Sequence, residues 1–138
     1  MKKFIYLLLV FSPFFIIAQN TTKKIKPPQI ITKLKIGKTI NLETKSIQFL
    51  KVIEDSRCPT GVSCFWEGQA KVLIGLYEND VLIEEKQIIV GAKDISPHNN
   101  KELLKSGEKT ILGYNLNPYP VVDQKINFSE YYLELLVK

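Results

Sequence analysis

Side chains that commonly carry catalysis or bind metals are scarce in this chain of 138 residues. It contains one histidine, His98, and two cysteines, Cys58 and Cys64. A blue-copper site needs two histidines and a cysteine and is excluded, and a structural zinc site wants four sulfur, nitrogen or carboxylate ligands. The sequence also lacks Gly-x-Ser-x-Gly, His-Glu-x-x-His and phosphate-binding glycine loops. We therefore expect no enzyme. A hydrolase with paired carboxylates stays open, because the separation of two carboxylates is not readable from sequence.

Long apolar runs are absent after the first 18 residues. Lys2 and Lys3 precede an apolar run from Phe4 to Ile17, and the small residue Ala18 follows. This order is typical of a secretory signal peptide, so residues 1–18 are predicted to be removed. The run is shorter than the ~18–20 residues that span a bilayer. We expect an exported chain, periplasmic or extracellular, with no transmembrane segment after cleavage.

Charge is unevenly distributed over the chain, whose formal net charge is +5. Residues 19–51 hold eight lysines and one acid, Glu43. Residues 19–29, which include Pro27-Pro28, are predicted to form a flexible leader. Stacking aromatics are not interleaved with these lysines, as they are in nucleic-acid-binding grooves. We expect no nucleic-acid partner, and we interpret the lysines as aids to solubility and as guards of an edge strand.

Residues 30–138 have the pattern of a single all-β domain. Apolar residues alternate with polar ones in several short runs, which predicts seven to eight antiparallel strands in a sandwich or a partly open barrel. Glu78-Asn79-Asp80 predicts a tight turn between residues 69–77 and 81–90. An imperfect alternation over residues 46–54 predicts a bulge or burial on both faces. Leu112 and Leu116 are expected to share one face of a strand, and residues 101–105 to form one helical turn.

The densest motif spans residues 55–70 and contains both cysteines, the single tryptophan and the single arginine. Five residues separate Cys58 from Cys64. Because exported cysteine pairs are usually oxidised, we predict a small disulfide loop, which contributes about 2 kcal/mol in the loop-entropy model. The spacing is longer than the Cys-x-x-Cys of thiol redox sites.

Four other residues of this motif are predicted to build a structural corner. Trp66 is expected to pack against the disulfide or the sheet. Gly68 suits a bulge or a close approach of backbone. Arg57 carries a planar guanidinium that is expected to pair with Asp55 or Glu67.

The motif resembles that of a family of uncharacterised small exported bacterial proteins. Its pattern is D-S-R-C-P-x-x-V-x-C-x-W-x-G-x-A, and residues 55–70 match each fixed position. Residues 116–120, Leu-Asn-Pro-Tyr-Pro, and the tyrosine-bearing C-terminal run from Tyr131 are similar to that family too. The resemblance implies a shared β fold and export, and it implies no activity.

Three classes of function remain open for the loop and its surroundings. The first is a binding module that displays Pro59, Thr60, Gly61 and Val62 on a preorganised ring, with a protease-inhibitor loop as one version. The second is a calcium site formed by hard oxygen donors, for which the candidates are Glu54, Asp55 and Glu67. The third is an enzyme.

Tyr119, held between two prolines, is either an exposed anchor for recognition or a side chain that seals the end of the sandwich. We favour a non-catalytic binding module without a cofactor. Its expected partner is a protein or a glycan of the cell envelope.

Overall fold

A computed structural model describes residues 30–91 and 93–138. The predicted signal peptide (1–18) and the predicted leader (19–29) lie outside the described residues. The described chain forms eight strands and one short 3-10 helix, η1 (Phe128–Glu130). No helix within the described ranges is long and apolar enough to cross a membrane.

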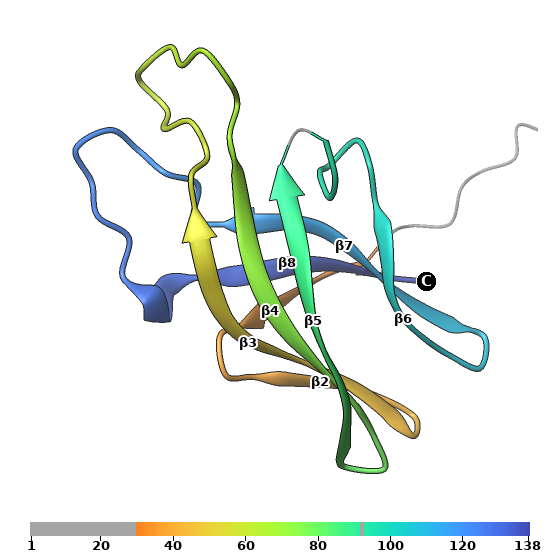
Figure 1. Cartoon of the computed structure of the whole chain (residues 1–138). Coiled ribbons are helices and arrows are strands. Elements are labelled where there is room, and N and C mark those ends of the chain that lie inside the picture. The colour runs from red at the N-terminus through yellow and green to blue at the C-terminus, as the bar shows by residue number, and fades with distance from the viewer. Residues whose placement is uncertain (1–29, 92) are drawn as a thin grey trace, which may run out of the picture.

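The strands form two antiparallel four-stranded sheets that pack face to face (Figure 1). One sheet has the order β1-β8-β7-β6, and the other has the order β2-β3-β4-β5. Because the strands form two separate sheets, the arrangement is a β-sandwich, the first of the two predicted alternatives. The strands are β1 (Ile30–Lys35), β2 (Thr39–Leu42), β3 (Lys45–Asp55), β4 (Gln69–Glu78), β5 (Val81–Gly91), β6 (Lys101–Ser106), β7 (Lys109–Asn117) and β8 (Tyr132–Val137).

The hydrophobic core lies between the two sheets. Alternate residues of β4, namely Ala70, Val72 and Ile74, are fully buried. They face residues of the opposite sheet such as Leu116 and Leu135. Strands with period-two apolar residues bury one face in this way because successive side chains point to opposite sides.

The tight turn between β4 and β5 is confirmed. Asn79 and Asp80 both have positive φ angles, 50° and 64°. Glu78 pairs with Val81 across the turn. A two-residue hairpin loop needs positive φ at both positions to match the twist of its strands, and Asn and Asp tolerate that conformation.

Bulges explain where the alternation of apolar residues fails. The predicted bulge in β3 is confirmed, with register shifts at Phe49/Lys51 and at Val52/Glu54. In β7 the register against β8 shifts between Gly113 and Asn115. Ile111 and Leu116 are therefore both buried on the core face, although they are an odd number of residues apart, and Leu112 lies on the opposite face. The prediction that Leu112 and Leu116 share a face was therefore wrong, because an extra residue in a strand reverses the faces beyond it.

The predicted helical turn at residues 101–105 is also wrong, because these residues belong to β6. Leu103 and Leu104 are both buried, and the register of β6 against β7 shifts between Glu102 and Leu104. Two adjacent apolar residues broke the period-two pattern. Local sequence alone did not show that a bulge, and not a helix, accounts for them.

Candidate binding site at the loop end of the sandwich

Three long loops meet at one end of the sandwich, which we name the loop end. They are the disulfide loop (residues 56–68, between β3 and β4), the β5–β6 loop (described from 93 to 100) and the β7–β8 loop (118–131). Figure 1 shows them beyond the upper ends of β3, β4 and β5, away from the hairpin turns at the opposite end. The candidate site therefore lies at the end of the sandwich that carries the long loops, and the short hairpin turns lie at the other end.

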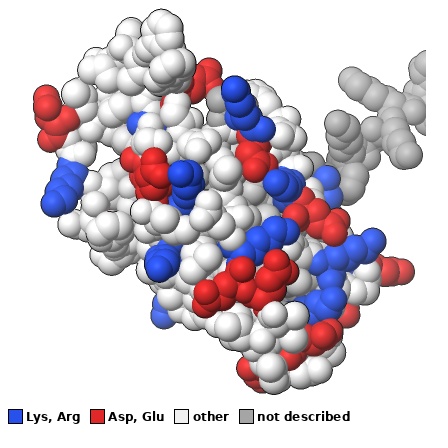
Figure 2. Space-filling model, viewed as in Figure 1, with Lys and Arg blue, Asp and Glu red and all other residues white. Residues whose placement is uncertain are grey.

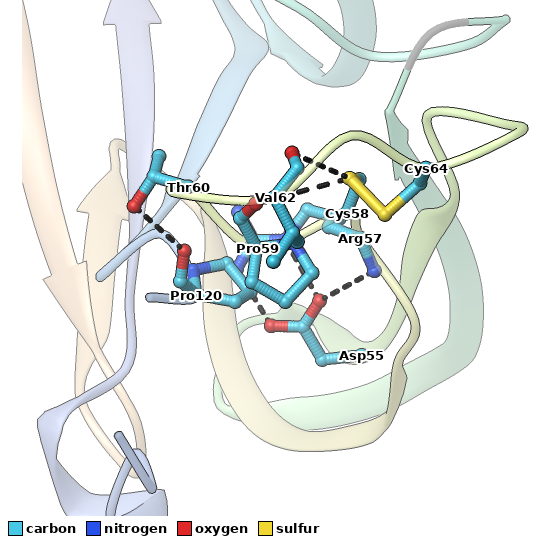
Figure 3. The surroundings of a disulfide bond; sticks show 8 residues. All are labelled: Asp55, Arg57, Cys58, Pro59, Thr60, Val62, Cys64 and Pro120. Carbon is cyan, nitrogen blue, oxygen red and sulfur yellow. Dashed lines mark hydrogen bonds and ion pairs between the residues drawn. A yellow bond between two sulfur atoms is a disulfide. The ribbon is translucent and has the colours of Figure 1, made fainter. Parts of the chain in front are cut away.

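The disulfide loop is fixed at its base by covalent and main-chain bonds. Cys58 and Cys64 form the predicted disulfide, with Cα atoms 5.9 Å apart (Figure 3). The Ser56 N–H donates to the Gln69 carbonyl at 2.9 Å, and the Cys58 N–H donates to the Glu67 carbonyl at 2.8 Å. These bonds extend the β3–β4 ladder into the loop, so its base is a continuation of the sheet.

Gly68 makes the close backbone approach that the sequence predicts. Its φ angle is +68°, and a Cβ atom placed on it would lie 1.9 Å from the Ser56 carbonyl oxygen. A side chain there would overlap the neighbouring strand. This position requires glycine both for its conformation and for its space.

Arg57 is buried, with 5% of its surface exposed, and its guanidinium joins the two sheets. Nε lies 2.8 Å from Asp55 Oδ1, and Nη2 lies 2.6 Å from Asp55 Oδ2 (Figure 3). The same group donates to the Leu116 carbonyl from Nη1 at 2.5 Å and to the Pro118 carbonyl from Nη2 at 3.0 Å. The predicted pairing with Asp55 is present. The two carbonyl contacts tie the end of β3 to the end of β7.

Two tyrosines complete the surroundings of this ion pair. The Tyr131 hydroxyl donates to Asp55 Oδ2 at 2.9 Å. The Tyr119 ring lies 4.8 Å from the guanidinium carbon of Arg57, a cation–π contact. Tyr119 remains 42% exposed. One face of its ring covers Arg57, and part of the ring faces solvent. Its role as an anchor for recognition stays a prediction.

The contacts in this cluster shift the pKa values of Asp55 and Tyr131 in opposite directions. Burial alone would raise the pKa of the Asp55 carboxyl, but the Arg57 hydrogen bonds and charge, with the Tyr131 hydroxyl, outweigh it and lower the pKa below 3.8. Burial, followed by the Asp55 hydrogen bond and charge, raises the pKa of Tyr131 to about 12 from 10.0. Both shifts favour a charged carboxylate beside a neutral phenol.

We expect the stability of the protein to fall at both extremes of pH. Because the pKa of Asp55 is lower folded than unfolded, its contribution is fully present above the unfolded value and is lost as pH falls through the folded value, below 3.8. The pKa of Tyr131 is raised on folding, so its contribution is lost as pH rises from 10.0 to about 12. Urea midpoints measured across the pH range test both limits.

Two conservative substitutions separate these effects. Asp55→Asn should remove the acid-side slope that Asp55 contributes, and Tyr131→Phe should remove the alkaline one. Each should also weaken the other limb, because the hydrogen bond between the two groups contributes to both pKa shifts. An acid limb unchanged in Asp55→Asn would mean that other carboxylates dominate acid unfolding.

The ring residues of the disulfide loop contact the β7–β8 loop through main-chain bonds. The Thr60 N–H donates to the Pro120 carbonyl at 2.9 Å, and the Val122 N–H donates to the Thr60 carbonyl at 3.1 Å. The Thr60 side chain also reaches the Pro120 carbonyl, at 3.3 Å (Figure 3). Thr60 and Val121 form an isolated parallel bridge. The two loops therefore form one hydrogen-bonded unit.

Phe65 and Trp66 stand exposed at the tip of the disulfide loop. They are 90% and 76% exposed, and their rings meet edge to face with centroids 4.6 Å apart. The prediction that Trp66 packs against the disulfide or the sheet was wrong. The loop projects beyond both sheets, and all residues from Thr60 to Glu67 are exposed.

Further apolar side chains are exposed on the disulfide loop and on the β7–β8 loop. They are Val62 on the disulfide loop and Tyr119, Val121, Val122 and Phe128 on the β7–β8 loop. Figure 2 shows the top of the molecule, where the disulfide loop lies, almost free of charged side chains, whereas acids and lysines are interspersed over the lower part. The tip of the disulfide loop is thus an apolar and largely uncharged surface.

A cleft of about 610 Å³ lies between the three loops. Pro59, Thr60, Val62 and Glu67 line it from the disulfide loop, and Ser96, Pro97 and His98 line it from the β5–β6 loop. Tyr119 closes a third side. Ligand sites usually have this size and this mixture of apolar walls with few polar groups. Sequence reasoning treated His98 as an ordinary loop residue, and no local signal showed that it faces the disulfide loop.

The three carboxylates predicted to bind calcium have other surroundings. Glu54 pairs with Lys71 at 2.8 Å, and the Lys71 hydrogen bond and charge lower the pKa of its carboxyl. Asp55 is held by Arg57, and only Glu67 lines the cleft. Within residues 30–91 and 93–138, no three acidic, histidine or cysteine side chains lie close enough to hold an ion. The calcium site stays a prediction from the sequence that this geometry does not support.

Comparisons with known proteins identify no relative: no family model, no curated protein and no solved structure matches the chain. The resemblance of residues 55–70 to a family of exported bacterial proteins therefore stays a prediction.

Proposed function

We propose that this chain is an exported, non-catalytic binding module that captures a protein partner at its loop end. In this proposal residues 1–18 direct export and are removed, and the sandwich acts in the periplasm or outside the cell. The disulfide agrees with such a compartment, because oxidising environments preserve cystine. The two sheets serve as a rigid base for the three loops.

The observation that carries the proposal is the exposed pair Phe65 and Trp66 on a rigid loop. Large aromatics are costly to leave in water, and interface hot spots are enriched in tryptophan and tyrosine. Here the disulfide and the bonds of Ser56 and Cys58 fix the loop before any partner arrives. A preorganised aromatic surface loses little conformational entropy on binding.

The geometry favours recognition through side chains over recognition through the loop backbone. An inhibitor-like loop offers free main-chain groups to a protease, but both main-chain groups of Thr60 are bonded to the β7–β8 loop. Among the described residues, the aromatic rings of Phe65 and Trp66 contact each other and remain mostly exposed. We therefore place the binding energy at Phe65 and Trp66, with the cleft beside them receiving a side chain or a chain end of the partner.

Site-specific photo-crosslinking in the cell envelope tests this proposal. A photoreactive phenylalanine analogue at position 65 is expected to give one defined protein adduct, since that side chain would lie in the interface. Excess purified wild-type protein should compete the adduct away. Excess Trp66→Ser protein should not compete, because the substitution removes a side chain that the partner would bury and leaves both cysteines of the disulfide loop in place.

The control places the same analogue at Lys105, an exposed position of β6 outside the three loops. It should give no adduct of that mass. Equal adducts from positions 65 and 105, or adducts that Trp66→Ser competes as well as wild type, would reject the proposal. Adducts with lipid alone would show that the loop end binds a membrane surface and not a protein.

A further inference from the structure

One edge of the sandwich exposes an unpaired strand far from the loop end. β5 is the last strand of its sheet and pairs with β4 on one side. Its upper part is covered, because the Ile95 N–H donates to the Ile89 carbonyl and the Gly91 N–H donates to the Ile95 carbonyl. From Val81 to Ile88, no strand among the described residues pairs with the outer side of β5.

The first three residues of this free edge are apolar and exposed. Val81 and Ile83 are 62% and 63% exposed, and Leu82 is exposed as well. Natural proteins usually protect an edge with prolines, inward charges or a short strand, because free N–H and C=O groups pair readily with another strand. β5 runs for eleven residues, Val81–Gly91, and contains no proline. Its register against β4 shifts between Leu82 and Glu84, so Ile83 is an extra residue, and the regular part of the free edge begins at Glu84.

The order of the charged residues along β5 favours pairing with a second copy of the same strand. Glu84, Glu85 and Lys86 follow each other at the middle of the free edge. Two copies of β5 can continue one antiparallel sheet about a two-fold axis perpendicular to it, and opposite residues then share a face. With the axis at Glu85, Glu84 of each copy lies directly opposite the partner's Lys86.

Neighbouring registers lack this complementarity. An axis at Lys86 sets two lysines opposite each other, and it sets Glu84 opposite the partner's Ile88. An axis at Glu84 sets two glutamates opposite each other, and it leaves Lys86 opposite the irregular stretch of the partner at Leu82 and Ile83. The Glu85 register forms two cross-strand ion pairs and one like pair, Glu85 with the partner's Glu85, on the other face. Opposite charges across strands stabilise a sheet, and like charges destabilise it.

We propose that a second copy of this chain pairs with the free edge of β5, centred on Glu85, and forms a symmetric dimer. The interface is short and therefore belongs to the weak, concentration-dependent class. The loop ends of the two copies point in opposite directions and stay accessible, so the dimer is independent of partner binding at Phe65 and Trp66.

Sedimentation velocity on the exported, purified protein tests the dimer from about 1 µM to about 1 mM, the range of weak dissociation constants. Wild type is expected to shift from monomer to dimer within it. Lys86→Glu, which turns both ion pairs into like pairs, should raise the dissociation constant at least about tenfold. The double variant Glu84→Lys, Lys86→Glu should return the dissociation constant to the wild-type value. Glu85→Gln should lower the dissociation constant below that of wild type, because it removes the like-charge pair.

Lys105→Glu is the matched control, because it makes the same change of net charge on the exposed edge strand β6. It should leave the dimer unchanged. The proposal is overturned by a monomer at every concentration, by a dimer that Lys86→Glu does not weaken, or by failure of the charge reversal to restore it. A dimer that Trp66→Ser abolishes would place self-association at the loop end instead.

Discussion

Replacing Arg57 with alanine is expected to lower the free energy of unfolding by about 3–5 kcal/mol. The substitution leaves the Asp55 carboxylate in a largely buried position with only the Tyr131 hydroxyl as a side-chain partner. It also removes the donor to the carbonyls of Leu116 and Pro118. Buried charges and acceptors that lose their partners cost far more than the net stabilisation of the intact pair. Urea unfolding at neutral pH, followed by circular dichroism, measures the effect.

Lys71→Ala is the matched control for Arg57→Ala. It also breaks an ion pair that involves the end of β3, but both side chains of the Lys71–Glu54 pair are substantially exposed. Exposed pairs typically contribute less than about 1 kcal/mol. The double variant Asp55→Ala, Arg57→Ala should recover part of the loss, since it leaves no unpaired charge. Equal effects of Arg57→Ala and Lys71→Ala would show that the Arg57 cluster does not hold the two sheets together.

The second large effect is expected at Gly68, where alanine should destabilise the protein by about 3 kcal/mol or more. The new Cβ would lie 1.9 Å from the Ser56 carbonyl oxygen, a backbone atom of the adjoining segment, and φ is +68°. Relief requires the base of the disulfide loop to separate, which disturbs the bonds from Ser56 to Gln69 and from Cys58 to Glu67. Thermal unfolding should show a lower melting temperature.

Gly37→Ala isolates the contribution of the overlap. Gly37 has nearly the same φ, +74°, but a Cβ placed there meets nothing within 4 Å. It should cost only the conformational penalty of about 1–2 kcal/mol. The difference between the two variants therefore measures the close approach of the two segments. If Gly37→Ala and Gly68→Ala unfold at the same temperature, the base of the disulfide loop yields easily and is not the rigid support that the proposed function requires.

Local rules were sufficient for much of the sandwich. The period-two pattern of Ala70, Val72 and Ile74 identified the buried face of β4, and Asn79-Asp80 identified the hairpin that follows it. The same rules misjudged Leu112 and residues 101–105, since a single extra residue in a strand reverses its faces without a distinctive sequence signal. Sequence patterns report neighbours along the chain, and a bulge is defined by the strand opposite.

Some features of the candidate site were likewise predictable from the sequence, and others were not. The sequence predicted the disulfide, the pairing of Arg57 with Asp55 or Glu67, and the special place of Gly68, because each observed contact joins residues at most twelve positions apart. It did not predict the exposure of Trp66, whose motif suggested a packed corner. An aromatic beside a disulfide is equally consistent with a buried corner and with a displayed tip until the height of the loop above the sheets is known.

By itself the sequence determined the all-β class, the alternation that builds the strands and the covalently closed loop between β3 and β4. The tertiary structure alone decided that Arg57 bonds carbonyls 59 and 61 residues away, that His98 and Tyr119 share a cleft with Pro59, and that β5 ends its sheet. The physical reason is that periodicity and turn propensity act over a few residues. Burial, pairing order and the meeting of loops depend on contacts between segments distant in the chain.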